Sequence, residues 1–291
     1  MPHVLLASCA DAAGRDDDEP LLLSALADAG LTAAVADWAD PGVDWAAAEL
    51  VVVRSTWDYA PRREQFLAWA RRVAAATTLL NPVGVLEWNT DKRYLAELAA
   101  AGLPVVPTAW VTEAGELPAA LARWDGDVVV KPVVSAGARD TARFPVAGRD
   151  RAAAFARRLL DAGRPVMVQP YLDRLDAEGE TGLVHLDGSF SHAFGKGALL
   201  AAGPLGAGLF AEETITARAA RDDQRAIGDD VLAVLRARTG EVPLYARVDL
   251  VPGPDGRPLL LELELTEPSL FLGVADGAAQ RLASAIAARL G

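Results

Sequence analysis

Two apolar segments near the end of the chain carry charged residues at alternate positions. Arg247 and Asp249 stand in the first segment and Glu262 and Glu264 in the second, with the turn-forming residues 252–256 between them. Alternate side chains of a β-strand point to the same face, so strands paired by that turn would bring three carboxylates together. Such acids repel one another unless a cation neutralises them, and oxygen ligands suit Mg²⁺ shared with phosphates. The spacing predicts a magnesium site; a solvated sheet face with alternating charges is the alternative.

A buried lysine is the second candidate for chemistry. Residues 128–130 are all valine, and Lys131 follows them at the end of the expected strand. Burying an ammonium group is costly unless it meets an anion, and the small residues around Ser135 and Gly137 would let backbone N–H groups approach phosphate. The segment indicates a phosphate-binding lysine, with a lysine that extends to solvent as the alternative. Neither GxxxxGK[ST] nor a GxGxxG after a strand occurs in the sequence.

Residues 54–59 offer side chains that suit a zwitterionic small molecule. They combine a cation, two hydroxyls, an acid and two aromatic rings directly after an expected strand. Arg54 suits a substrate carboxylate and Asp58 suits an amine, while Ser55 and Thr56 add hydroxyl groups. The alternative is a helix-capping turn whose aromatic rings pack between domains.

His192 is the best substrate-contact candidate among the three histidines, because it lies on an expected strand close to Lys196. A single histidine on a strand is nevertheless usually structural. The acidic run at residues 16–19 favours a solvated loop before a helix over a substrate contact.

The first part of the sequence alternates strands and helices in short units. This order predicts a parallel sheet wound with helices, and ligands of such sheets bind beyond the carboxyl ends of the strands. Later segments predict an α+β arrangement with antiparallel strands, including a hairpin turn at Asp187-Gly188. Strands are expected at 4–8, 50–54, 128–130, 165–169, 182–186, 190–194, 244–251 and 259–265. Helices are expected at 20–29, 62–76, 92–101, 217–238 and 276–290.

Composition limits the class of protein. The 291 residues are enough for two or three small domains, and the net charge of −12 disfavours nucleic acid as a partner. The single cysteine, Cys9, cannot form an internal disulfide, which fits a cytoplasmic protein. No apolar run approaches the length of a membrane helix, and the N-terminus is typical of a first strand rather than a signal peptide.

An ordered series of short motifs resembles the ATP-grasp superfamily. The resemblance implies an α/β fold, α+β in its later part, with three units. These are an N-terminal parallel α/β domain at 1–85, a nucleotide-binding subdomain at 86–172 and a metal-binding subdomain at 173–291. The motifs, in order, are Asn81-Pro82, Asp91-Lys92, 102–108, Val130-Lys131-Pro132, Gln169–Leu172, Lys196, Arg247–Asp249 and Glu262–Glu264.

The resemblance also implies ATP and two Mg²⁺ ions, with roles for individual residues. Arg247 and Lys196 would be catalytic, and Asp249, Glu262 and Glu264 would bind metal. In most relatives the last metal ligand is an Asn followed by a Pro-Gly turn, so Glu264 departs from the pattern. The residues expected to bind the nucleotide are Lys92, Lys131, Ser135, Gly137, Gln169, Tyr171, Leu172, Asp176 (or Glu178) and Lys196.

Residues 54–59, 191–196 and 262–269 are similar to a small branch of actinobacterial ligases that includes the D-cycloserine synthetases. This implies a ligase that forms an acyl phosphate from a small amino-acid-like carboxylate and joins it to a nitrogen. The preferred reaction is cyclisation of O-ureido-D-serine to D-cycloserine, with Arg247 stabilising the oxyanions. The alternatives are an intermolecular dipeptide or glutathione-synthetase-like ligase, and an ATP-binding regulator without catalysis. Relatives also imply a homo-oligomer, either a dimer or a tetramer.

Overall fold

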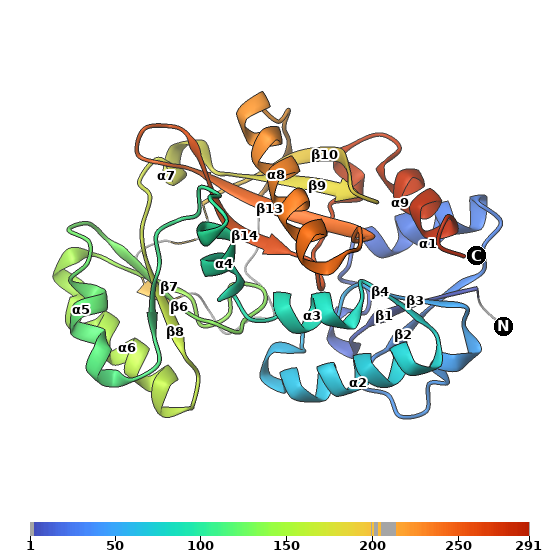
Figure 1. Ribbon diagram of the computed structural model, residues 1–291, viewed down its shortest axis with the longest axis horizontal. Helices are drawn as coiled ribbons and strands as arrows, with labels where there is room; N and C mark the ends of the chain where they lie inside the picture. Colours follow the sequence, from blue (N-terminus) through green and yellow to red (C-terminus); the bar gives the residue numbers. More distant parts are fainter. Residues whose placement is uncertain (1–2, 199, 201–202, 205–213, 291) are drawn as a thin grey trace.

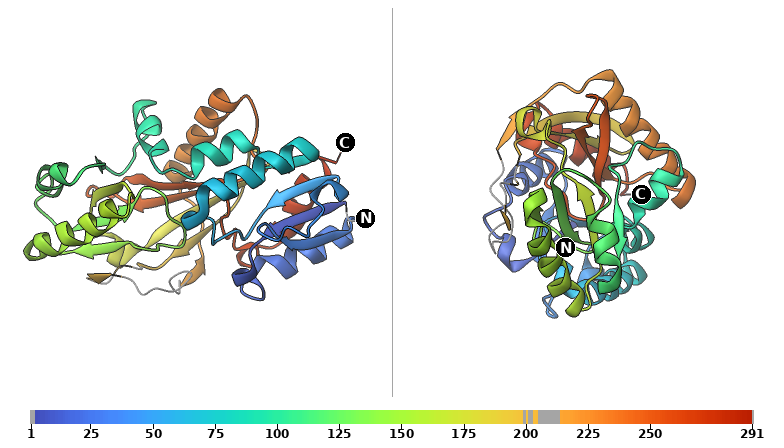
Figure 2. Two further views of the ribbon diagram at one scale, coloured as in Figure 1. Left: turned by 90° about the horizontal axis from the view of Figure 1, so that it is seen from below. Right: turned by 90° about the vertical axis from the view of Figure 1, so that its left-hand side faces the viewer.

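The computed structural model describes residues 3–198, 200, 203–204 and 214–290. The described strands form three sheets, one of four strands and two of five. We call them the N-terminal sheet (residues 4–80), the distal sheet (109–204) and the central sheet (180–264). The central sheet lies between the other two in an elongated molecule (Figure 1, Figure 2). The predicted class, α/β at the start and α+β later, is confirmed.

The N-terminal sheet is parallel and is covered on both faces. Its strands are, in order, β2 (Ala33–Asp37), β1 (Val4–Ser8), β3 (Leu50–Val53) and β4 (Thr78–Leu80), with helices α1 (Asp18–Asp28), α2 (Arg63–Ala76) and α3 (Val83–Asn89). Val4 and Leu6 enter one core with α1 and with the C-terminal helix α9 (Ala278–Ala287). Leu5 and Ala7 enter the other core with α2. Because β1 is buried on both faces, its residues 4–7 are all apolar, as is typical of parallel sheets.

The distal sheet is antiparallel and carries helices on one face only. Its order is β11 (Gly203–Pro204), β7 (Ala142–Phe144), β6 (Val128–Pro132), β8 (Val166–Pro170) and β5 (Ala109–Val111), with helices α5 (Leu117–Leu121) and α6 (Arg149–Asp161). Val128 and Val130 pack in the helix-side core, whereas Val129 packs with Tyr171 on the opposite side. Strand alternation places Lys131 on the same side as Val129.

The central sheet is also antiparallel and carries charge on one face. Its order is β12 (Ile215–Ala217), β10 (Ser189–Lys196), β9 (Glu180–Leu186), β13 (Tyr245–Pro252) and β14 (Pro258–Glu264), with helices α4 (Tyr94–Ala100), α7 (Leu175–Glu178) and α8 (Asp222–Thr239). Ala246 and Val248 pack in a core with residues of α4 and α8. Arg247 and Asp249, which alternate with them, point to the other face.

Of two local predictions, a hairpin turn and the start of a helix, the first is confirmed and the second is wrong. The hairpin at Asp187-Gly188 is confirmed, with φ of 48° and 75° at the two residues. The start of the long helix at residue 217 is wrong, because residues 215–217 form β12 and pair with β10. The helix begins instead at Asp222, and Gly240 ends it in a left-handed conformation with φ of 73°.

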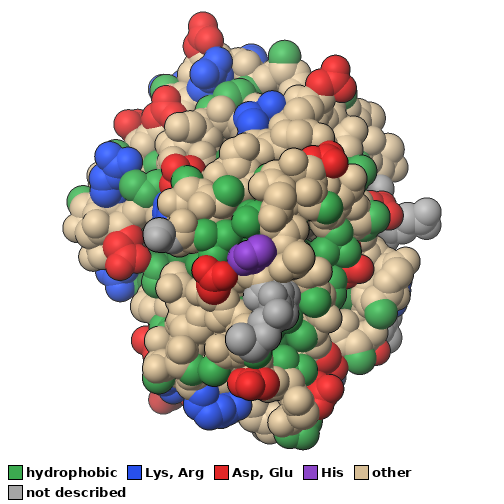
Figure 3. Space-filling model, turned by 90° about the vertical axis from the view of Figure 1, so that its right-hand side faces the viewer, with side chains coloured by type: hydrophobic (Ala, Val, Ile, Leu, Met, Phe, Trp, Pro, Cys, Tyr) green, Lys and Arg blue, Asp and Glu red, His purple; other side chains and the backbone are tan. Residues whose placement is uncertain are grey.

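None of the helices among the described residues is long and apolar enough to cross a bilayer. On the end face of the molecule, acidic and basic side chains are dispersed among apolar ones (Figure 3). The described residues drawn on this face therefore offer no continuous basic surface for a polyanion.

Candidate active site

A cavity of about 710 Å³ brings together the three parts of the molecule. The distal sheet and its loops contribute Lys131, Gln169 and small residues, the central sheet contributes acids, Lys196 and Arg247, and the N-terminal part contributes acids and aromatic rings. Charged and aromatic residues of the lining include Arg15, Asp16, Asp17, Asp18, Trp57, Tyr59, Lys92, Lys131, Tyr171, Glu180, Lys196, Arg247, Asp249, Glu262, Glu264, Glu267 and Phe271. The cavity thus unites residues that are far apart in the sequence.

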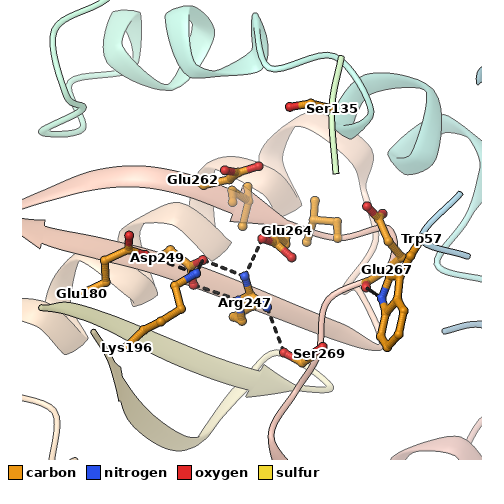
Figure 4. A network of polar contacts seen from close by, with 12 residues as sticks. Trp57, Ser135, Glu180, Lys196, Arg247, Asp249, Glu262, Glu264, Glu267 and Ser269 are labelled. Atoms are coloured by element: carbon orange, nitrogen blue, oxygen red, sulfur yellow. Dashed lines mark hydrogen bonds and ion pairs between the residues drawn. The ribbon is translucent and has the colours of Figure 1, made fainter. Parts of the chain in front are cut away.

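Arg247 lies at the centre of the acidic cluster on the central sheet (Figure 4). The turn pairs β13 with β14 as predicted, with Arg247 opposite Glu264 and Asp249 opposite Glu262. The guanidinium donates from Nε to Asp249 Oδ1 at 2.9 Å and from Nη2 to Asp249 Oδ2 at 2.8 Å. It also binds Glu264 and donates to the carbonyl oxygen of Ser269 at 2.9 Å. These bonds fix the orientation of a cation that faces the cavity.

The three predicted metal ligands lie on two paired strands, with Asp249 opposite Glu262 and Glu264 opposite Arg247. Among the described residues, no group of three or more His, Cys, Asp or Glu side chains is arranged to hold a metal ion. Basic side chains neutralise the acids instead: Lys92 Nζ lies 2.7 Å from Glu262 Oε1, and Arg247 binds both Asp249 and Glu264. Glu262 and Glu264 still fit a hard cation, because their side chains are 22% and 26% exposed and share one face of β14.

The pKa values of Glu262 and Glu264 shift in opposite directions. Burial favours the neutral form of Glu262, but Lys92 and Lys131 outweigh it and hold the pKa of Glu262 below its ordinary value. Burial raises the pKa of Glu264 despite Arg247, because Asp249 and Glu262 add to the effect. This asymmetry arises because the lysines lie on the Glu262 side of the cluster.

The lysines expected to hold phosphate all reach the cavity. Lys92 Nζ donates to the carbonyl oxygen of Ser135 at 2.8 Å, and the charge of Glu262 raises its pKa against the opposing effect of burial. Burial lowers the pKa of Lys131 and outweighs the nearby carboxylates. Lys196 Nζ lies 3.3 Å from Glu180 Oε2. The structure therefore brings together three lysines from separate parts of the chain. The local sequence pattern indicated a phosphate-binding role for Lys131 alone, whereas the resemblance to the ATP-grasp superfamily implied it for all three.

The nucleotide-side residues also line the cavity, with one exception. Ser135, Gly137, Gln169, Tyr171 and Leu172 are all part of the lining. The backbone N–H of Tyr171 is already used, because it donates to the carbonyl oxygen of Asp127 at 2.8 Å. An adenine contact through that N–H is therefore not available in this structure.

Asp176 is the exception, since it is outside the described lining of the cavity. Its carboxylate accepts from the Tyr171 hydroxyl and lies 3.3 Å from Arg143 Nη1. It therefore orients Tyr171 rather than facing a ligand. Glu180, which sequence reasoning missed, does line the cavity, and its register opposite Lys196 on β9 and β10 is the signal that identifies it.

The predicted substrate residues at the end of β3 are outside the described lining of the cavity. Arg54 is 4% exposed, and its Nη2 lies 3.5 Å from Asp18 Oδ2. The hydroxyl of Ser55 donates to Asp16, and Thr56 is fully buried. The expectation that these three contact substrate is not supported by their placement, because the strand end packs beneath the lining instead of forming it.

Asp58 and His192 likewise have structural partners. Asp58 accepts from Trp38 Nε1 at 2.7 Å and pairs with Arg62. His192 is buried, its Nε2 lies 2.8 Å from the carbonyl oxygen of Leu270, and burial lowers its pKa. Neither side chain lines the cavity among the described residues. His192 supports the chain segment around Leu270, which does reach the cavity.

Other residues take the places expected for substrate contacts. Asp16 and Asp17 line the cavity just beyond the carboxyl end of β1, where ligands of parallel sheets bind. Trp57, Glu267 and Phe271 complete this end, and Trp57 Nε1 donates to the carbonyl oxygen of Glu267 at 3.1 Å. The acidic residues that follow the first strand therefore line the cavity, although their charge alone favoured a solvated loop.

Comparison with known proteins agrees with this architecture. Residues 4–81 match the family described as the N-terminal domain of D-cycloserine synthetase DcsG. The chain is 43% identical over 286 residues to the cycloserine biosynthesis protein DcsG of Streptomyces lavendulae, covering 94% of each chain. A crystal structure of D-cycloserine synthetase DcsG superposes with a TM-score of 0.92 at 41% identity, covering 99% of each chain. The ATP-grasp ligase PsnB, solved with a precursor variant, Mg and ADP, has the same fold with a TM-score of 0.65 at 21% identity, covering 100% of this chain and 99% of PsnB. The chain therefore has the ATP-grasp fold and belongs to the D-cycloserine synthetase family.

Proposed function

We propose that this protein activates the carboxylate of O-ureido-D-serine with ATP and cyclises it to D-cycloserine, releasing ADP and phosphate. The observation that carries the proposal is the fixed guanidinium of Arg247, which faces the same cavity as Lys92, Lys131 and Lys196. Four cations converging on one cavity suit the transfer of a phosphoryl group to a carboxylate, in which negative charge accumulates. The similarity to a cycloserine biosynthesis protein over 94% of the chain supports the choice of substrate.

ATP is proposed to bind along the distal-sheet side of the cavity. Gln169 and Leu172 would meet the adenine, and Ser135 and Gly137 would lie over the phosphates. Gln169 is buried, and its Nε2 donates to Thr108 Oγ1 at 3.0 Å, so its amide is already oriented. The phosphate tail would extend toward the lysines, because a polyanion is most stable near the buried cations.

Glu262, Glu264 and Asp249 are the proposed ligands of Mg²⁺, and two ions are the proposed number. Bound Mg²⁺ offsets the charge of phosphate oxygens and acts as a Lewis acid. Glu262 and Glu264 fit this role by their oxygen donors and their exposure to the cavity. Asp249 is 3% exposed and is held by Arg247, so its part is to fix the guanidinium as well as to add charge.

The reaction is proposed to proceed in two steps. A carboxylate oxygen of the substrate attacks the terminal phosphorus of ATP, forming an acyl phosphate and ADP, while the lysines hold the departing phosphates. The oxygen-bound nitrogen of the same molecule then attacks the acyl carbon and loses its proton, and phosphate leaves with the electron pair of the broken C–O bond. After these two steps water hydrolyses the carbamoyl group from the ring nitrogen, releasing CO₂ and ammonia and leaving D-cycloserine. Arg247 donates hydrogen bonds to the oxyanion of each step. Both reacting groups belong to one substrate, so the cavity's task is to hold a folded conformation.

A screen of ADP release over amino-acid derivatives, with products identified by mass, tests this function. O-Ureido-D-serine alone is expected to release ADP and to yield D-cycloserine. ADP release that requires two different substrates together would indicate an intermolecular ligase instead. ATP binding without ADP release for any derivative would indicate a regulator without catalysis, and either result overturns the proposal.

Location and assembly extend the proposal. A cytoplasmic location fits an enzyme that consumes ATP and carries one buried, free cysteine, Cys9. A homo-oligomer, dimer or tetramer, is proposed by analogy with relatives, and light scattering of the purified protein measures it directly.

A further inference from the structure

The charges along the cavity are distributed unevenly. The nucleotide side holds four cations, Lys92, Lys131, Lys196 and Arg247, together with four carboxylates that pair with them. The opposite end, formed by the N-terminal part and the segment after β14, holds Asp16, Asp17 and Glu267 with Arg15, so carboxylates outnumber cations in its described lining. The acidic end therefore suits the positively charged group of a zwitterion.

Two acids of this end are already committed to the fold. Asp18 accepts backbone N–H bonds from Leu270 at 2.6 Å, Phe271 at 3.0 Å and Leu272 at 2.6 Å. Asp16 accepts from the hydroxyl of Ser55 and from the backbone N–H of Asp18 at 3.0 Å. These carboxylates build the wall of the cavity and have little capacity left for a ligand.

Glu267 differs from them. Its carboxylate lines the cavity, and no hydrogen bond or ion pair joins it to any residue within the described part of the chain. In Figure 4 its side chain rises from the loop on the same side as Glu264, above the ring of Trp57. Burial and the carboxylates of Glu264 and Glu262 raise the pKa of Glu267 against the opposing effect of Lys92 and Arg247, so its charged form gains from a further positively charged ligand.

The backbone that presents Glu267 is held in place from several sides. Trp57 Nε1 donates to the Glu267 carbonyl oxygen at 3.1 Å, and Arg247 Nη1 donates to the Ser269 carbonyl oxygen at 2.9 Å. Asp18 anchors the residues that follow. The carboxylate of Glu267 and the guanidinium of Arg247 are consequently tied to one short segment, which fixes their separation.

We propose that Glu267 binds the α-ammonium group of the amino-acid substrate while the substrate carboxylate lies toward Arg247. This inference rests on the proposed function and names a specificity residue for it. Two fixed charges, with the rings of Trp57 and Phe271 limiting the side-chain direction, give a three-point attachment that selects one enantiomer. Arg247 and Glu267 would thus take the roles expected for Arg54 and Asp58. The side chains of those two residues bind Asp18 and Trp38 instead.

The test is a thermodynamic cycle in which binding affinity is measured with and without a substitution at Glu267 and with and without the α-amino group of the ligand. Glu267→Gln keeps the size of the side chain and removes its charge. Calorimetry on enzyme loaded with Mg²⁺ and a non-hydrolysable ATP analogue measures the Kd of O-ureido-D-serine and of its analogue that lacks the α-amino group. Wild type is expected to lose roughly 10- to 100-fold in affinity when the amino group is removed, the range of a charge-assisted hydrogen bond. Glu267→Gln is expected to bind both ligands with nearly equal affinity.

Control measurements separate the outcomes. The nucleotide affinity of Glu267→Gln should equal that of wild type, which shows that the variant is folded. Asp276→Asn removes an exposed carboxylate further along the same segment and should leave both Kd values unchanged.

The remaining outcomes overturn the inference. Equal discrimination by wild type and Glu267→Gln would refute an ammonium contact. Loss of turnover without a change in either Kd would make Glu267 a proton acceptor, and loss of nucleotide affinity alone would make it a metal ligand. If wild type binds neither compound, the proposed function fails together with the inference. If both proteins bind both compounds but Glu267→Gln does not change the effect of removing the amino group, only the inference fails.

Discussion

Among the described residues, the guanidinium of Arg247 binds two carboxylates and one backbone carbonyl. A cation held in this way needs no reorganisation when negative charge develops beside it. The same partners couple Arg247 to stability, because its removal would take the paired cation from Glu264 and leave buried Asp249 with Lys196, whose Nζ lies 3.7 Å away. A substitution of Arg247 is therefore expected to affect both the catalytic rate and the stability of the fold.

Replacing Arg247 by alanine is expected to lower kcat by roughly 10²- to 10³-fold, the loss typical of one oxyanion donor. ATP affinity should stay close to the wild-type value, because the lysines that hold phosphate remain. Steady-state kinetics and nucleotide titration measure the two quantities. Arg257→Ala removes an 83% exposed arginine from the neighbouring turn and should change neither. A loss of ATP affinity as large as the loss of rate would contradict the catalytic role.

His185 gives the molecule a pH-dependent stability that is independent of the active site. The ring is 1% exposed beneath α8, with Asp229 and Arg225 as its charged neighbours, and burial lowers its pKa to about 4. The unfolded chain takes up the proton near pH 6.5, so acidification from pH 6.5 to 4 favours unfolding by up to roughly 3 kcal/mol. Above pH 6.5 this contribution is constant.

His185→Leu should flatten that part of the stability profile. Urea denaturation at intervals from pH 7 to 4 compares the variant with wild type, and the difference isolates one histidine from the other titrating groups. Parallel profiles for the two proteins would show that His185 does not titrate as its burial indicates.

At the scale of elements, the pairing of β9 with β10 depends on a glycine. Gly182 lies opposite Phe194, and a Cβ at Gly182 would lie 2.2 Å from the Phe194 ring. The ring is fully buried, and its centroid is 4.5 Å from that of Phe271, so it has little room to move. Gly182→Ala is expected to destabilise the protein by roughly 1–3 kcal/mol.

Urea denaturation of Gly182→Ala measures this cost. Gly84→Ala is the matched control, since Gly84 lies in α3 and a Cβ there would have no described neighbour within 4 Å, so the change should be neutral or slightly stabilising. Equal stability of the two variants would show that the Phe194 ring moves aside freely.

Elements with an unambiguous pattern could be predicted from the sequence, and others could not. The all-apolar strand at 50–53 and the face of α2 that buries Phe66 and Trp69 follow directly from periodicity. β2 was missed because none of its five residues is buried, and β4 because it has three residues. The three-unit division at residues 85 and 172 remains a prediction.

At the scale of the whole molecule, Asn81 joins the N-terminal sheet to the central sheet. Its Nδ2 donates to the carbonyl oxygens of Tyr245 at 3.0 Å and Leu265 at 2.8 Å, and its Oδ1 accepts from Leu244 N at 2.8 Å. Asn81 is fully buried, so Asn81→Ala would leave these backbone groups without partners. The expected destabilisation is roughly 2–5 kcal/mol.

Thermal and urea unfolding test this link. Thr32→Ala removes an exposed hydroxyl that binds the backbone N–H of His3, and it should cost less than about 1 kcal/mol. A similar small cost for Asn81→Ala would show that the interface does not depend on this side chain.

The cavity was predicted in part. Strand alternation and the turn fixed the relative places of Arg247, Asp249 and Glu264, because these residues are close in sequence. The substrate end depends on contacts between residues more than 200 positions apart, such as Trp57 with Glu267. No local pattern shows whether Arg54 faces a ligand or Asp18, because that choice is made when the sheets pack together.

The proposed function depends most on the formation of an acyl phosphate in this cavity. The direct measurement uses O-ureido-D-serine labelled with ¹⁸O in its carboxylate, and mass spectrometry of the phosphate released during turnover. An acyl-phosphate mechanism predicts that each released phosphate carries one ¹⁸O atom transferred from the substrate. Unlabelled phosphate released together with D-cycloserine would contradict it.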